Sequence, residues 1–159
     1  MSNNTLNPKP NTRKALILVS ILYLLNATIG TLLAVQANLP AEFFGKDGKP
    51  ALADFLIGNG TALSAPLYLC IILALFIILA FQPRRIGTLG IAGLTILGIC
   101  FIIGALGEPI TYKVLNPATF DLPKALVVVI EIVLPLLMVT FGTIELVHRR
   151  GRFIAPIAD

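Results

Sequence analysis

Four long apolar runs constrain this chain more than any other feature of its sequence. They cover residues 15–35, 61–81, 86–106 and 124–147. Each has at least the roughly 20 residues that a helix needs to cross the hydrocarbon of a bilayer. Because lipid offers no partner to backbone N–H and C=O groups, uninterrupted runs of this length cross as helices. The sequence therefore predicts an all-α fold, an integral membrane four-helix bundle that forms one transmembrane domain over residues 1–159.

The composition agrees with lipid as the main solvent. Hydrophobic residues make up 57% and charged residues 13% of the chain, against about 25% charged residues in ordinary soluble domains. The net charge is +4, but the basic residues form short clusters beside the apolar runs, which is typical of anchoring at a membrane surface. We therefore expect the lipid bilayer as a partner and exclude nucleic acid.

The positions of the Lys and Arg residues predict the orientation of the four spans, because these residues concentrate on the cytoplasmic side. Eight of the 12 lie before the first run, between the second and third, or after the fourth: Lys9, Arg13, Lys14, Arg84, Arg85, Arg149, Arg150 and Arg152. The outer loops are then 36–60 and 107–123. Both tails, 1–14 and 148–159, are expected in the cytoplasm, with the protein in the plasma (inner) membrane.

The first run has a second interpretation. The basic residues before it and the small residues around 35–37 resemble the two ends of a secretory signal peptide, whose removal would leave three spans. The run over 15–35 is longer than the about 7–15 apolar residues of a usual signal core. We therefore expect a retained first span.

Small residues recur on one face of the third run. In lipid there is little hydrophobic drive between helices, so such faces mark close helix packing. The stripe follows helical steps of three and four and consists of Gly90, Gly93, Leu97, Cys100, Gly104 and Gly107. A similar line on the first run includes Gly30. Both faces are expected to lie against other helices.

The fourth run contains an acid well inside the apolar stretch. Glu131 lies seven residues after Lys124, about 10 Å along a helix. An ionised carboxylate at that depth is costly, so Glu131 is expected to be protonated, paired or facing a watery cavity. Pro135, one turn further on, leaves the carbonyl of Glu131 without its helical partner. These features fit a small-cation, proton or polar-ligand site, with polar support from Asn26, Tyr23 and Tyr68. They fit a buried acid that is hydrogen-bonded to the same residues equally well.

Other chemistry has little support. Cys70 and Cys100 form no CxxC pair, and His148 is the single histidine, so neither a metal site nor a cofactor is expected. No nucleotide-binding or hydrolase motif is present. Glu108, after the third run, could contribute to the rim of a cavity, with a solvated loop as the default.

Three classes of function follow in order. The first is a polar-ligand- or proton-coupled binding or transport protein that uses Glu131. A homodimer is expected in that case, because four helices enclose little volume. The second is a structural or accessory subunit that docks a partner membrane protein through the glycine stripe. A membrane enzyme ranks last, because one acid has no evident catalytic partner.

Overall fold

The computed structural model describes residues 11–42 and 49–154, and the side chains of these residues up to 150. Over these residues the chain is all-α, as predicted, with no sheet. The helices are α1 (Thr12–Gln36), α2 (Ala51–Ile57), α3 (Leu67–Phe81), α4 (Arg84–Gly107), α5 (Pro109–Leu115) and α6 (Leu122–Ile154). The sequence positions Lys9 and Arg152, used above for orientation, lie outside the described side chains.

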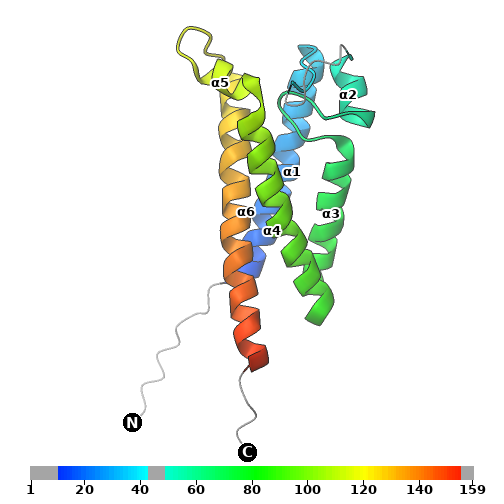
Figure 1. Cartoon of the computed structure of the whole chain (residues 1–159), viewed down its shortest axis with the longest axis vertical. Coiled ribbons are helices and arrows are strands. Elements are labelled where there is room, and N and C mark those ends of the chain that lie inside the picture. The colour runs from blue at the N-terminus through cyan, green and yellow to red at the C-terminus, as the bar shows by residue number, and fades with distance from the viewer. Residues whose placement is uncertain (1–10, 43–48, 155–159) are drawn as a thin grey trace, which may run out of the picture.

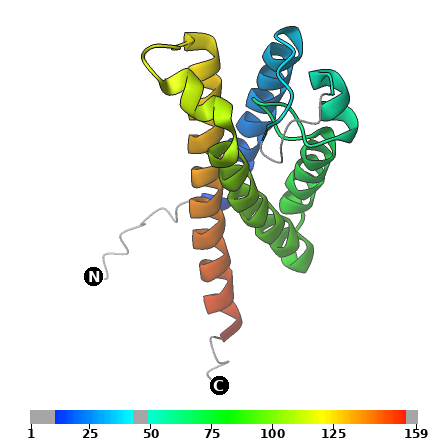
Figure 2. The same ribbon diagram turned by 45° about the horizontal axis from the view of Figure 1, so that its top comes forward.

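The four longest helices form a ring in the order α1, α6, α4, α3, and neighbours in the ring run antiparallel (Figures 1 and 2). α6 packs against α1 and α4, and α3 packs against the same two helices from the other side. The short α2 rests on α1 and α3, while α5 rests on α4 and α6. Both short helices therefore lie at one end of the ring.

The two ends of the ring differ in composition. The arginine end holds the start of α1, the link between α3 and α4, and the last turns of α6, with Arg13, Arg84 and Arg149. The loop end holds α2, α5 and the segments 37–42, 49–66 and 108–121 (Figure 1). This division matches the separation of basic residues from longer loops that the sequence predicts.

Three helices, α1, α4 and α6, are long and apolar enough to cross a membrane. They contain the first, third and fourth predicted runs in full. The second run, predicted over 61–81, begins later, because α3 starts at Leu67 and has 15 residues. The structural reason is Pro66, whose ring disfavours helical dihedrals in the preceding Ala65. The residues before it form a turn in which the N–H of Thr61 donates to the carbonyl of Ser64.

The turn over 61–64 packs directly on α1. A Cβ atom at Gly30 would lie 2.1 Å from the carbonyl oxygen of Leu63, so the backbones can approach this closely only at a glycine. The hydroxyl groups of Thr31 and Ser64 are 2.7 Å apart beside this contact. Leu63 is fully buried. The turn thus fills the place that another turn of helix was predicted to occupy.

The glycine stripe of α4 packs tightly near the arginine end. A Cβ atom at Gly90 would lie 2.3 Å from the backbone nitrogen of Ala80, and one at Gly93 would lie 2.3 Å from the ring of Phe76. Both neighbours belong to α3. Without side chains at these two positions, α3 and α4 come into close backbone contact, as small residues permit in membrane helices.

The same stripe has no helix against it near the loop end, contrary to the prediction of one continuous packing face. A Cβ atom at Gly104 would meet nothing within 4 Å, and Cys100 is exposed. Gly107 is the last residue of α4. α3 and α4 diverge toward the loop end (Figure 1), and this divergence is the physical reason. The stripe changes from a packing face into an open one.

A second close approach of α4 was not predicted. Gly98 faces α6, where its nearest neighbours are Met138, Val139 and the carbonyl of Pro135. Gly98 falls between the positions of the predicted stripe, on a different face of the helix. α4 therefore uses separate small residues for its two neighbours.

Buried Asp54 organises the loop end. Its carboxylate accepts hydrogen bonds from the backbone N–H groups of Ala41 at 3.0 Å and Asn59 at 2.8 Å. The side-chain oxygen of Asn38 accepts from the N–H of Ala51 at 3.1 Å. These bonds hold the first residues of the outer segment against α2. Asp54 therefore holds residues 41 and 59 together at the loop end.

The second outer segment is shorter and ends at an ion pair. Asp121 precedes α6 and contacts the ammonium group of Lys124. The hydrogen bond from this ammonium group lowers the pKa of the Asp121 carboxyl below its ordinary value. The negative charge also suits the positive N-terminus of the helix. The start of α6 is thus fixed at the surface.

Candidate functional site

Glu131 lies in the first third of α6, and 7% of its surface is exposed. The hydroxyl group of Tyr23, on α1, donates a long hydrogen bond of 3.5 Å to its Oε1 atom. Tyr23 is itself 1% exposed, and its ring stacks on Phe101 of α4 with 4.4 Å between the ring centroids. Three helices therefore meet around this carboxyl group.

Asn26 makes a different contact from the one expected of a direct partner of Glu131. Its amide group donates to the carbonyl oxygen of Val127 at 3.2 Å. Val127 lies four residues before Glu131, one helical turn toward the loop end. Asn26 therefore ties α1 to α6 beside the site.

The polar groups of Asn26 and Glu131 lie between two apolar clusters. The larger cluster includes Leu16, Leu73, Ile91, Leu94 and Met138 and fills the ring toward the arginine end. The smaller cluster, at the loop end, joins Ala34, Leu63, Val114, Ala125 and Val128. A buried polar group needs a hydrogen-bond partner to offset the loss of water. Tyr23 and Val127 supply these partners.

A cavity of about 340 Å³ reaches the carboxyl group of Glu131. It is bounded by α1, α3, α4, α6 and the segment 59–66, where α3 and α4 diverge. Tyr23 and Phe101 line its inner part, and Tyr68 and Ile103 line its outer part. The cavity has the size of known small-molecule sites, which begin at about 300 Å³.

The cavity opens between α3 and α4. Tyr68 is 52% exposed and Ile103 is 57% exposed, whereas Glu131 and Tyr23 at the inner part are buried. Gly104 lies on the same wall, and no neighbouring atom stands within 4 Å of its Cβ position. The sequence grouped Tyr68 with Glu131, and in the structure an exposed Tyr68 and a buried Glu131 line the same cavity.

Glu108 is a second acid in the wall of the cavity, where the sequence offered a cavity rim as the alternative to a solvated loop. It is 9% exposed and accepts a hydrogen bond from the backbone N–H of Glu42 at 3.1 Å. It also lines a second groove at the loop end with Glu42 and Lys113. The default interpretation of this residue, a solvated loop position, is wrong, because the folded outer segment covers it.

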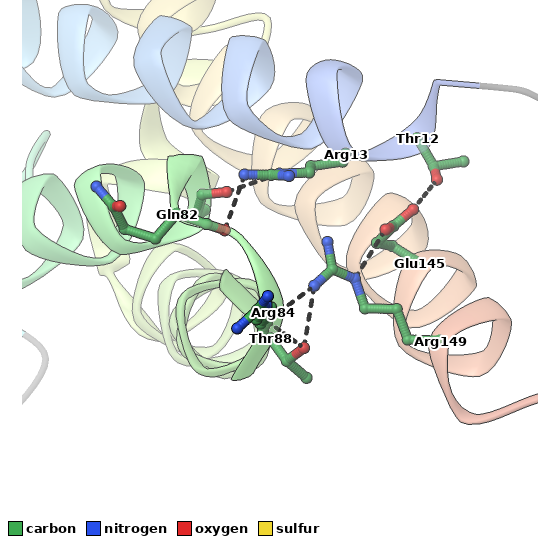
Figure 3. Close-up of polar contacts among 8 residues, drawn as sticks. Thr12, Arg13, Gln82, Arg84, Thr88, Glu145 and Arg149 are labelled. Carbon is green, nitrogen blue, oxygen red and sulfur yellow. Dashed lines mark hydrogen bonds and ion pairs between the residues drawn. The ribbon is translucent and has the colours of Figure 1, made fainter. Parts of the chain in front are cut away.

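The arginine end of the ring is closed by hydrogen bonds to backbone carbonyls. Arg13 donates to the carbonyl of Ala80 at 2.7 Å and to that of Gln82 at 3.0 Å (Figure 3). These carbonyls belong to the end of α3, which leaves its last acceptors without helical partners. The guanidinium group supplies these partners and holds α1 against α3.

Glu145 and Arg149 close the other side of the arginine end. Glu145 accepts from the hydroxyl group of Thr12 and from Nε of Arg149, the latter at 2.9 Å. Arg149 also donates to the hydroxyl group of Thr88 at 3.0 Å (Figure 3). These contacts join α1, α4 and α6. The i+4 spacing of Glu145 and Arg149 was visible in the sequence, but the contacts with Thr12 and Thr88 were not.

Neither cysteine forms a disulfide. Cys70 is half-buried, and Cys100 is exposed on the wall of the cavity. Within the described parts of the chain, no group of three or more His, Cys, Asp and Glu residues could hold a metal ion.

Comparison with protein-family models, with curated proteins and with solved structures finds no match to this chain. The findings therefore define a helical protein with three candidate membrane spans, and any function must be argued from its own residues.

Proposed function

We propose that the chain crosses a bilayer four times, with both termini in the cytoplasm, and binds or transports a small ligand or proton at Glu131. The observation that carries this proposal is the cavity that reaches the Glu131 carboxyl group from the gap between α3 and α4. A carboxyl group in a membrane span is costly and marks a functional site by default. A cavity beside it provides access.

The fourth span in this proposal is α3. Its 15 residues reach about 22 Å at 1.5 Å per residue. The folded turn over 61–66 adds length at the loop end. The link to α4 consists of Gln82 and Pro83, so the two helices are antiparallel neighbours and α3 must return across the bilayer if α4 crosses it.

The orientation in this proposal follows from the arginine end. Arg13, Arg84, Arg85, Arg149 and Arg150 gather at that end of the ring. Cytoplasmic loops and tails carry an excess of such residues. Both termini are then cytoplasmic, and the cavity lies in the outer half of the membrane.

A Glu131→Gln variant tests the proposal. The protein would be reconstituted in vesicles and studied by infrared difference spectroscopy between mildly acidic and mildly alkaline external pH. We expect a carboxyl band that responds to external pH in the wild type and is absent in Glu131→Gln. Circular dichroism would establish that the variant stays helical, and Glu42→Gln, at an ion pair with Lys113, serves as the control.

A carboxyl band of Glu131 that ignores external pH would contradict the proposal. If the Glu131→Gln variant then also changed its assembly in detergent, the accessory-subunit hypothesis would take precedence. In that case Glu131 would serve to hold helices together, through Tyr23, rather than to bind a ligand.

A further inference from the structure

We propose that the ligand of this cavity is a free long-chain amine, whose ammonium group binds at Glu131 and whose apolar chain extends through the gap between α3 and α4 into the lipid. This inference rests on the proposed function, since it names the class of ligand for the same cavity. Its argument comes from the charge of the wall, its aromatic rings and the place where the cavity opens.

The charge of the wall favours a cation. Two acids, Glu131 and Glu108, line the cavity, and the hydroxyl group of Tyr23 lies 3.5 Å from the first of them. None of the described residues in the wall is Lys, Arg or His. An anion would therefore meet two carboxyl groups and no basic side chain. An ammonium group can instead donate hydrogen bonds to a carboxylate, and such charge-assisted bonds are strong.

The aromatic side chains add a second element of ammonium recognition. The stacked rings of Tyr23 and Phe101 lie beside Glu131 in the inner part of the cavity, and Tyr68 stands at its opening. The faces of aromatic rings attract cations, and the attraction is stronger where water is excluded. Carboxyl groups and aromatic rings in one cavity thus select an ammonium group over a neutral hydroxyl group.

The opening of the cavity accounts for the apolar chain. Leu69 of α3 and Ile103 of α4 stand on its two sides, and Ile103 is 57% exposed on the surface that faces lipid in the proposed span arrangement. Between them Gly104 leaves an open space. A ligand dissolved in the bilayer can enter here without leaving the membrane. A phospholipid with an amine head group has the same ammonium chemistry, but its phosphate would find no basic side chain in the wall.

The test uses the full chain in nanodiscs of phosphatidylcholine. The probe is dodecylamine with a photoreactive diazirine midway along its chain, and mass spectrometry locates the adducts. We expect adducts on Tyr68, Leu69 or Ile103 that excess dodecylamine suppresses and that dodecanol or dodecanoic acid does not. Loss of a charge-assisted bond in Glu131→Gln should reduce labelling at least about tenfold. Equal competition by all three competitors would overturn the ammonium assignment.

Gly104→Phe tests the route of entry. A Cβ atom at Gly104 would meet no atom within 4 Å, so we expect the variant to fold, lose labelling at the opening and keep the infrared titration of Glu131. Ile96→Phe, on the exposed surface of α4 away from the cavity, is the matched control and should label like the wild type. Full labelling of Gly104→Phe would overturn entry between α3 and α4.

The infrared titration separates the two proposals. If Glu131 titrates but dodecylamine does not label the cavity, the ligand class is wrong and the proposed function stands. If Glu131 does not titrate, both are wrong. Nanodiscs that contain phosphatidylethanolamine distinguish the sources of the ammonium group: unchanged labelling supports a free amine, and competition by this lipid overturns that choice.

Discussion

The arginine end and the loop end are built from the same four helices, yet polar groups do opposite things at the two. At the arginine end a two-residue link holds α3 and α4 together, and Arg13 and Arg149 donate to the backbone carbonyls and hydroxyl groups that the helix ends expose. At the loop end α3 and α4 diverge, and an acid and a tyrosine face a cavity. The difference shows that the distance between two helices decides whether polar groups seal the bundle or line a site.

The largest expected effect comes from adding one methyl group where α3 and α4 are in contact. The same change where the two helices have diverged is its control. In Gly90→Ala the new Cβ atom would lie 2.3 Å from the backbone nitrogen of Ala80, so α3 or α4 must shift. Overpacking of this kind costs about 1–3 kcal/mol. Gly104→Ala meets no neighbour and should change the free energy of unfolding by less than about 1 kcal/mol. Unfolding in mixed detergent micelles measures both, and equal effects would contradict the divergence.

A smaller effect is expected from the ion pair at the arginine end. Glu145→Gln removes the charge that Arg149 contacts at 2.9 Å in a partly buried position. Loss of a hydrogen bond to a charged group should lower the free energy of unfolding by about 1–2 kcal/mol.

The matched control for this ion pair lies at the loop end. Glu42→Gln alters the pair with Lys113, whose atoms are 3.7 Å apart and whose lysine side chain is 59% exposed. Exposed pairs contribute about 0–1 kcal/mol. A larger loss in Glu42→Gln than in Glu145→Gln would show that the loop end, rather than the arginine end, holds the bundle closed.

The smallest effect concerns the first turn of α6. Lys124 lowers the pKa of Asp121 in the folded chain, so the contribution of this pair is present above the unfolded pKa and is lost as pH falls through the folded one. Hydrogen exchange at the amide of Lys124, corrected for the intrinsic rate, should therefore become faster in acid. In Asp121→Asn the corrected rate should not depend on pH. A helix start that stays protected in acid would contradict this prediction.

The sequence predicts the long helices well and their local exceptions poorly. The runs over 15–35, 86–106 and 124–147 lie within α1, α4 and α6, because uninterrupted apolar stretches of this length have few alternatives in lipid. The run over 61–81 was started too early. Small and apolar residues extend the hydropathic run back to Thr61. The helix nevertheless begins only at Leu67, because Pro66 restricts the backbone of Ala65.

The contacts of the candidate site, too, could be predicted only in part from the sequence. Helical periodicity turns Glu131, Tyr23 and Asn26 toward the interior, and the structure brings the first two into contact. The partner of Asn26 is a backbone carbonyl. Every residue has a backbone carbonyl, so the sequence does not indicate which one accepts this bond. The position of Glu108 depends on a contact with residue 42, 66 residues earlier in the chain. Contacts at that separation follow from the folding of the loop end, which no local pattern encodes.

The late start of α3 has a consequence for the surrounding lipid. At about 22 Å this helix is shorter than the roughly 30 Å of hydrocarbon in an average bilayer, whereas α1, α4 and α6 exceed that length. In the proposed arrangement of four spans, the helix on the α3 side is the shortest, and acyl chains beside it would compress unless the turn over 61–66 makes up the length. The lipid around the protein would then be thinner beside α3 than beside the other helices. The protein should therefore favour thin, short-chain bilayers and turn its α3 side toward the thinnest region.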